Sequence, residues 1–195
     1  MTQDNLTAKQ KDYAVFLPSI SAIYARIVSM PEYNVRDKLP DGLDCDRQNL
    51  NFLNPSNSLF YYPAALYSAG HAELEIKNTD IFENMVQKRD RSRTVILGDS
   101  GGFQIATGVL KWPWTKKKDQ SDLDWTRDKD AMRLKILRWL EYTADYSMVL
   151  DVPTYGLVRF GFDPVTGQSL HPGMKTFKDC LNVSLENYDF FIRNR

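Results

Sequence analysis

Residues 94–104 have the sequence TVILGDSGGFQ, in which a short apolar run ends in an acid, a serine and two glycines. Thr94–Leu97 is apolar enough to predict a buried strand. Gly101 and Gly102 carry no Cβ, so the backbone can turn sharply after that strand and approach a ligand closely. Asp99 and Ser100 then lie at the carboxyl end of the strand, which is the edge where α/β folds bind their ligands.

Strands and helices are predicted to alternate along the chain, which favours a parallel sheet with crossover helices. The predicted strands are Tyr13–Leu17, Leu59–Tyr62, Thr94–Leu97 and Tyr146–Leu150, and the predicted helices are Ser19–Met30, Asp80–Arg91, Asp130–Ala144 and Lys175–Ile192. The small residues of Ala64–Gly70 predict a tight helix or turn. Residues 32–58 are rich in Pro, Asn, Asp and Gly and predict a long loop or insertion.

Three of the predicted helices carry an apolar stripe at helical spacing. The expected stripes are Ile20, Ile23, Tyr24 and Ile27 in the first helix, Met132, Ile136, Leu140 and Thr143 in the third, and Phe177, Leu181, Leu185, Tyr188 and Ile192 in the last. The first two stripes are expected to face the core, with Arg133 on another face of the third helix. The last stripe is expected to need a partner surface.

The composition describes a chain that can bury a core but has no overall charge. It has 195 residues, 43% of them hydrophobic, and its 25 basic side chains cancel 25 acidic ones. One domain over residues 1–195 is therefore expected, and any nucleic-acid contact must be local. Cys45 and Cys180 form no metal-binding spacing, so no metal site is predicted. No signal peptide or membrane span is visible, which favours a cytoplasmic protein.

A second acid stands in a position comparable to that of Asp99. Asp151 follows the apolar run Tyr146–Leu150, and the two carboxylates are expected at one edge of the shared sheet. Taken alone, Asp151 is also compatible with a helix N-cap or a loop acid before Pro153.

Residues 98–102, GDSGG, also look like the nucleophile loop of chymotrypsin-type proteases, with His71 as a possible partner. Such proteases build a His, Asp, Ser triad from two β-barrels, and the residues between His71 and Ser100 are too few to form one. We therefore expect His71 to be a surface or loop residue.

The motif Asp99-Ser100-Gly101-Gly102-Phe103-Gln104 resembles the signature of the tRNA-guanine transglycosylase superfamily, which includes queuine tRNA-ribosyltransferase. These are TIM-barrel enzymes that exchange a guanine base in nucleic acid for a 7-deazaguanine such as preQ0. In that family a second aspartate ends the next barrel strand, in an apolar-Asp-x-x-x-Tyr context that Leu150–Tyr155 matches. The resemblance thus implies a transferase with a TIM-barrel-like (β/α) fold.

The resemblance also implies roles for the residues of the two motifs. Asp151 would accept hydrogen bonds from the ring N1–H and the exocyclic amino group of a guanine-type base. Asp99 is the candidate catalytic acid or base, because base exchange leaves negative charge on the departing base and requires a proton acceptor for the incoming one. Ser100 and Gln104 would supply further polar contacts to the base. Phe103 would stack on it or belong to the core.

Two features of the family have no counterpart in this sequence: a third aspartate that acts as the nucleophile on the ribose carbon, and a zinc site of three Cys and one His. A complete (β/α)₈ barrel needs roughly 250 residues. We therefore expect the N-terminal half of a barrel, inactive alone for lack of the nucleophile, with no visible cofactor. The expected partner is a C-terminal half-barrel or a second protomer.

The segment Lys111–Lys118 interleaves Trp112 and Trp114 with Lys116, Lys117 and Lys118, a mixture expected where a phosphate backbone and an unstacked base are bound, or in a solvated loop. Residues 16–21, 66–71 and 138–141 are most similar to the phage and bacterial branch of the superfamily that modifies DNA. DNA or tRNA is thus the expected partner. Two alternatives stay open: a glycoside hydrolase-like barrel with two carboxylates, and a non-catalytic half-barrel that binds a partner.

Overall fold

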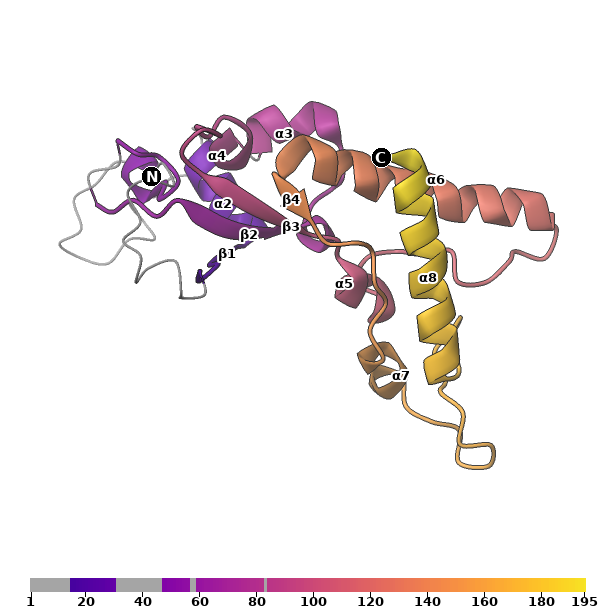
Figure 1. Ribbon diagram of the computed structural model, residues 1–195. Coiled ribbons are helices and arrows are strands. Elements are labelled where there is room, and N and C mark those ends of the chain that lie inside the picture. Colours follow the sequence, from indigo (N-terminus) through magenta and orange to yellow (C-terminus); the bar gives the residue numbers. More distant parts are fainter. Residues whose placement is uncertain (1–14, 31–46, 57–58, 83) are drawn as a thin grey trace.

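The structure is a computed structural model that describes residues 15–30, 47–56, 59–82 and 84–195. Its centre is a four-stranded parallel sheet with the strands in sequence order (Figure 1). The strands are β1 (Ser19–Ile20), β2 (Ala64–Ser68), β3 (Val95–Asp99) and β4 (Tyr146–Ser147). An α/β fold with a parallel sheet was predicted, and at that level the prediction is confirmed.

Helices connect the strands and cover one side of the sheet. They are α2 (Ala22–Ser29), α3 (Ile76–Phe82), α4 (Asn84–Gln87), α5 (Gly102–Ala106), α6 (Asp122–Thr143), α7 (Tyr155–Arg159) and α8 (Phe177–Asn194), with the 3₁₀ helices η3 (Arg47–Leu50) and η4 (Ala69–His71). Figure 1 shows α3, α4 and α6 along one side of the sheet and α5 beyond the ends of the strands. Side-chain oxygens of Ser21, Ser121 and Thr176 cap the first turns of α2, α6 and α8.

The strand register divides the sheet into a covered face and an open face. Ile20, Tyr67 and Gly98 lie in one row of paired residues, and all three are buried. The ring of Tyr67 lies 5.3 Å from that of Trp139 on α6. A Cβ on Gly98 would lie 2.7 Å from Leu140 of the same helix, so α6 rests directly on the sheet backbone at this point.

An ion pair between a buried arginine and a partly exposed aspartate joins the ends of two helices to the start of β3. The side chain of Arg89 is fully buried; it donates to the Val86 and Thr143 carbonyls and pairs with Asp145 at 2.7 Å. The same oxygen of Asp145 accepts a hydrogen bond from the Ile96 amide at 2.7 Å. Burial lowers the pKa of Arg89, and its bond to Asp145 opposes that shift.

The predicted elements near the amino end differ from the observed ones. Val15–Leu17 is not a strand; β1 starts after Pro18, and the remainder of predicted strand Tyr13–Leu17 lies outside the described residues. The first helix spans Ala22–Ser29 and buries Ala25, Val28 and Ser29, whereas Ile23 is exposed. The expected stripe was therefore wrong at Ile23, whereas Ile20 is in the core and Tyr24 packs against it.

The predicted order of strand and turn around residue 62 was also wrong. Leu59–Tyr62 does not pair with any strand of the sheet. The strand is Ala64–Ser68, where a tight helix or turn was expected. Ala64 and Ala65 suit a strand in the middle of a parallel sheet, where local propensity yields to close packing. Of the predicted loop 32–58, residues 47–56 contain η3 and two core residues, Phe52 and Leu53; the other residues lie outside the described part.

The later elements agree better with the prediction. Instead of one helix over Asp80–Arg91 the chain forms α3 and α4, and β4 contains only the first two residues of Tyr146–Leu150. Helix α6 begins at Asp122 rather than Asp130, because Ser121 supplies the cap. Arg133, expected away from the core, is buried between α6 and α8. Helix α8 lies close to its predicted bounds, Lys175–Ile192.

In the ranges that the structure describes, we find no helix with the length and apolar character needed to cross a lipid bilayer.

Replacement of Arg89 by methionine is expected to lower the free energy of unfolding by about 3 kcal/mol, because it leaves Asp145 without its buried partner and two carbonyls without a donor. The matched control is Arg91→Met, which removes a half-exposed arginine 3.6 Å from the same carboxylate and should cost less than about 1 kcal/mol. Urea unfolding of both variants measures the difference. Equal losses would contradict the role given to Arg89.

Candidate functional site at the carboxyl edge of the sheet

The motif after β3 forms a tight turn from strand to helix. Asp99 ends β3 and is half-buried, and its Oδ1 accepts a hydrogen bond from the Gly101 amide at 3.4 Å. Gly101 has φ +77°, a left-handed conformation that favours glycine, and α5 starts at the next residue. The prediction of a strand followed by a sharp glycine turn is confirmed.

The second glycine of the motif brings the two predicted acidic segments together. A Cβ on Gly102 would lie 1.6 Å from the carbonyl oxygen of Asp151 and 3.3 Å from its Oδ1. The first turn of α5 therefore rests directly on the backbone at Asp151, which any other residue at position 102 would push away. Asp151 itself is exposed, so its carboxylate is open to solvent. Asp99 ends β3, whereas Asp151 lies four residues after the end of β4, beside the first turn of α5.

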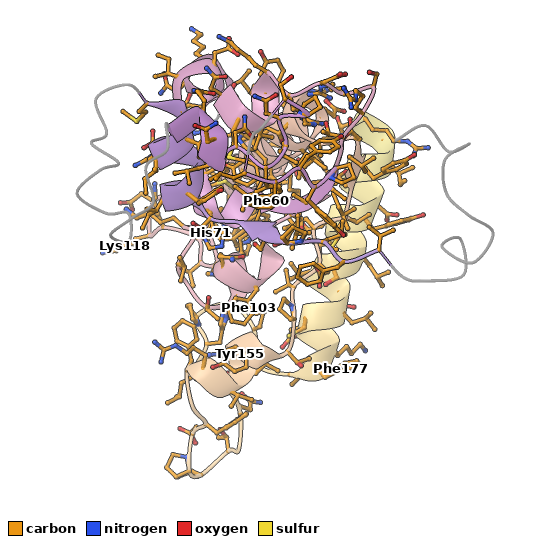
Figure 2. All side chains as sticks on the ribbon, turned by 90° about the vertical axis from the view of Figure 1, so that its left-hand side faces the viewer. Phe60, His71, Phe103, Lys118, Tyr155 and Phe177 are labelled. Carbon is orange, nitrogen blue, oxygen red and sulfur yellow. The ribbon has the colours of Figure 1, made fainter. Side chains whose placement is uncertain are left out.

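Two aromatic rings, one from each segment, stack beside these acids. Phe103 on α5 and Tyr155 at the start of α7 have ring centroids 5.3 Å apart and planes 23° apart. Figure 2 shows the two labelled side chains next to each other at the ends of their helices. Half of each residue's surface is exposed. Phe103 therefore does not belong to the core and offers an aromatic face to solvent.

Two polar atoms of the motif are buried without a hydrogen-bond partner in the described part of the chain. They are the Oγ of Ser100, a fully buried residue, and the Oε1 of Gln104. Gly70 makes room for the Gln104 side chain, since a Cβ there would lie 2.4 Å from its Cδ. Buried polar groups are usually paired because desolvation without a partner costs free energy. The turn therefore holds two polar oxygens that are both buried and unpaired.

The predicted nucleic-acid segment divides into a packed part and an exposed part. Trp112 is buried, and Trp114 packs edge-on against His171 with ring centroids 4.7 Å apart. Lys116, Lys117 and Lys118 are exposed, and Lys116 pairs with Asp122 at 2.8 Å. The three lysines therefore lie at the surface, whereas both tryptophan side chains pack against other residues of the protein.

A buried histidine that the sequence analysis did not single out holds the segment after α7. Nδ1 of His171 accepts hydrogen bonds from the Gly173 and Met174 amides, so Nε2 carries the proton and donates to the Ala106 carbonyl at 3.1 Å. Burial lowers the pKa of His171. The only local signal was the Pro-Gly turn that follows it. His71, in contrast, is exposed on η4, as predicted.

Among the described residues, no three His, Cys, Asp or Glu side chains gather in a way that could hold a metal ion. Cys180 is a free, buried thiol whose pKa is raised by burial, and Cys45 lies outside the described ranges.

Comparison with known proteins returned no relative: no family model, no curated protein and no solved structure matches this chain.

Gly102→Ala is expected to destabilise the protein by about 3 kcal/mol, because the new Cβ would overlap the Asp151 carbonyl and force the two segments apart. Gly167→Ala is the control: unlike Gly102, Gly167 has a positive φ, of +66°, but apart from its chain neighbours no atom lies within 4 Å of the site of its Cβ. That variant should lose only about 1 kcal/mol. Denaturant unfolding of both proteins tests the comparison, and similar losses would show that the close approach matters little.

The stability of the protein is expected to fall as the pH is lowered through about 6.5, the ordinary pKa of histidine. The unfolded chain binds a proton there, whereas folded His171 resists protonation because burial lowers its pKa. The slope should reach up to about 1.4 kcal/mol per pH unit. Free energies of unfolding between pH 5 and 7 should show a smaller slope for His171→Gln. An unchanged slope in that variant, or a reduced one in the exposed control His71→Gln, would contradict this assignment.

Proposed function

We propose that the chain carries the base-binding part of a guanine transglycosylase, an enzyme that exchanges guanine in DNA or tRNA for a 7-deazaguanine. The single observation that carries the proposal is the contact between the two motifs, in which Gly102 rests on the backbone of Asp151. This contact supports the resemblance to the transglycosylases. The resemblance rests on two segments that are far apart along the chain, and in the structure these segments meet at the edge where such an enzyme would bind its base.

The exposed groups at this edge complement a purine of the guanine type. The ionised carboxylate of Asp151 can accept from two donors on one edge of the base at once. Phe103 and Tyr155 present an aromatic surface against which the base plane can lie. Ser100 and Gln104 are proposed to supply further polar contacts when the base displaces the residues that bury the Ser100 Oγ and the Gln104 Oε1. Recognition thus uses one charge, one stacking surface and two polar contacts.

Asp99 is proposed as the proton-transfer group. It lies beside the proposed base site, half-buried at the strand end, and it accepts a hydrogen bond from the Gly101 amide. A carboxyl group in this position can donate a proton to the departing guanine and take one from the incoming base. The nucleophile on the ribose carbon has no candidate among these residues, and the family resemblance assigns it to a later barrel strand.

The sheet topology favours a (β/α)-barrel over a doubly wound sheet. Four parallel strands follow one another in sequence order, without the reversal that creates a switch point in doubly wound folds. In a barrel the carboxyl ends of all strands form one rim, and the active site is built there. We therefore propose a half-barrel, with Asp99 and Asp151 on its rim.

The nucleic acid would be held by the exposed lysines and not by the tryptophans. Lys116, Lys117 and Lys118 can neutralise phosphates, and Figure 2 shows Lys118 projecting at one side of the molecule, apart from Phe103. The sequence favours DNA, and parallel assays with DNA and tRNA distinguish the two substrates.

Asp151→Asn is expected to weaken the binding of guanine and of 7-cyano-7-deazaguanine about ten- to a hundredfold, because the neutral amide can no longer accept two hydrogen bonds with a full charge. Equilibrium dialysis with labelled base measures the loss. Asp189→Asn, which changes an exposed acid on α8, is the matched control and should bind as tightly as the native chain.

The same labelled bases should be incorporated into DNA or tRNA when the nucleophile is supplied, and Asp99→Ala should abolish that incorporation. A chain that binds neither base, or whose Asp151→Asn variant binds both unchanged, would contradict the proposal. Hydrolysis of a sugar substrate without base exchange would favour a glycoside hydrolase instead.

A further inference from the structure

The chain between α7 and α8 forms a hairpin that projects from the molecule, which we call the 160–170 hairpin. Figure 1 shows it extending past the ends of both helices, on the side away from the sheet. Phe162 and Ser169 pair across it in antiparallel fashion, and residues 164–166 form the turn at its tip. Val165 in that turn is 90% exposed, and Phe162 is 51% exposed. The hairpin therefore presents apolar side chains to solvent at the end of a projection.

The tip of the hairpin is held in one conformation by its own hydrogen bonds. Oδ1 of Asp163 accepts from the amides of Val165 and Thr166, at 2.9 and 2.7 Å. The Asp163 amide donates to the Gln168 carbonyl at 2.8 Å, and the Gly167 amide donates to the Asp163 carbonyl at 2.9 Å. The bonds from Thr166 lower the pKa of Asp163, so its carboxylate stays ionised within the turn. A tip that is ordered in advance loses little conformational entropy on binding.

The inner end of the hairpin is attached to α7 and, through His171, to α5. The Oγ of the buried Ser169 donates to the Leu157 carbonyl at 2.9 Å and accepts from the His171 amide at 3.1 Å. The ring of Phe160 packs edge-on against His171, with centroids 4.8 Å apart. Nε2 of His171 in turn contacts the Ala106 carbonyl at the end of α5. The hairpin therefore has a fixed direction relative to the candidate site.

Exposed aromatic and apolar side chains lead from the candidate site towards the hairpin. Tyr155 and Val158 are three residues apart on α7, so their side chains lie on the same side of that helix. They are 50% and 61% exposed. Phe103 stacks on Tyr155 from α5, and Figure 2 shows the hairpin continuing below Tyr155. The apolar tip thus lies beyond α7 as seen from the stacked rings.

The charges around the hairpin favour a polyanion as its partner. Residues 152–178 contain three basic side chains, Arg159, Lys175 and Lys178, all of them exposed, but only one acid, Asp163. That acid is engaged in the turn at the tip. Because the whole chain has as many acidic as basic side chains, this segment is a local excess of positive charge. Such an excess attracts the phosphates of a nucleic acid.

We propose that the 160–170 hairpin is a wedge that enters duplex DNA, with Phe162 and Val165 between neighbouring base pairs and the basic side chains on the phosphates. This inference rests on the proposed function, because an enzyme that exchanges a base must first take that base out of the duplex. Proteins that kink or open DNA frequently insert apolar side chains at a base step. The wedge keeps the stack open while the extruded guanine reaches the carboxylate of Asp151.

The test uses the full chain and a short DNA duplex in which 2-aminopurine, whose fluorescence rises when it is unstacked, lies next to a guanine. The native chain should raise this fluorescence. The double variant Phe162→Ser/Val165→Ser should abolish the rise and weaken duplex binding about tenfold, while binding of the single strand changes less than about twofold. Val109→Ser is the matched control, since Val109 is 71% exposed outside the hairpin, and it should behave as the native chain does.

Val165→Ser alone tests the wedge even if the double variant misfolds. The turn uses only the backbone amide of Val165, so this exposed side chain can be changed without loss of the turn. Its fluorescence rise should be at least about threefold smaller than that of the native chain. An unchanged rise in this variant, or equal losses of duplex and single-strand binding in the double variant, would overturn the proposal. So would binding of the hairpin to vesicles of anionic lipid and not to DNA.

Equilibrium dialysis with free guanine separates this inference from the proposed function. The hairpin variants should bind the free base as tightly as the native chain, because the wedge acts only on the duplex. A native chain that binds free guanine but leaves the duplex stacked would contradict the wedge alone. A native chain that opens the duplex through the hairpin without binding free guanine would support the wedge and contradict base exchange.

Discussion

The arrangement of the carboxyl edge depends on how closely the start of α5 approaches the chain at Asp151. That approach is possible only because residue 102 has no Cβ, and it fixes α5 against the segment that leads into α7. Once the two segments touch, Phe103 and Tyr155 stack and the two acids lie at one edge. His171 adds a second contact, a hydrogen bond from the segment after α7 to the Ala106 carbonyl at the end of α5. The site is thus held by backbone contacts, while Asp151, Phe103 and Tyr155 stay exposed.

The parts of the fold that were predictable from the sequence are those that a local sequence pattern determines without help from tertiary contacts. The strand and glycine turn at residues 94–102 follow from local chemistry, and α8 follows from its spacing and its cap at Thr176. The strand Ala64–Ser68 was not predictable, because small residues indicate a turn until a helix is known to press on the sheet. The position of Trp112 likewise depends on a tertiary contact, with the buried Arg133.

The candidate site was predictable as a pair of segments but not in its supporting contacts. Asp99 and Asp151 each follow an apolar run, so their meeting at one edge could be expected from parallel strands. The unpaired Ser100 Oγ and the proton position on His171 depend on burial by distant residues, which no local pattern indicates. The proposed base recognition therefore rests on the chain segments that follow the strand ends.

The carboxylate of Asp145 couples strand β3 to the helices behind it. One of its oxygens serves both the Arg89 guanidinium and the backbone amide of Ile96, and Arg89 also holds the last carbonyl of α6. Strand β3 cannot separate from its neighbours at this end without also freeing the end of α6 and the residues after α4. Strand β3, the end of α6 and the residues after α4 must therefore unfold together as one cooperative unit. Local unfolding of the strand that carries Asp99 thus requires the helix ends bound to it to unfold as well.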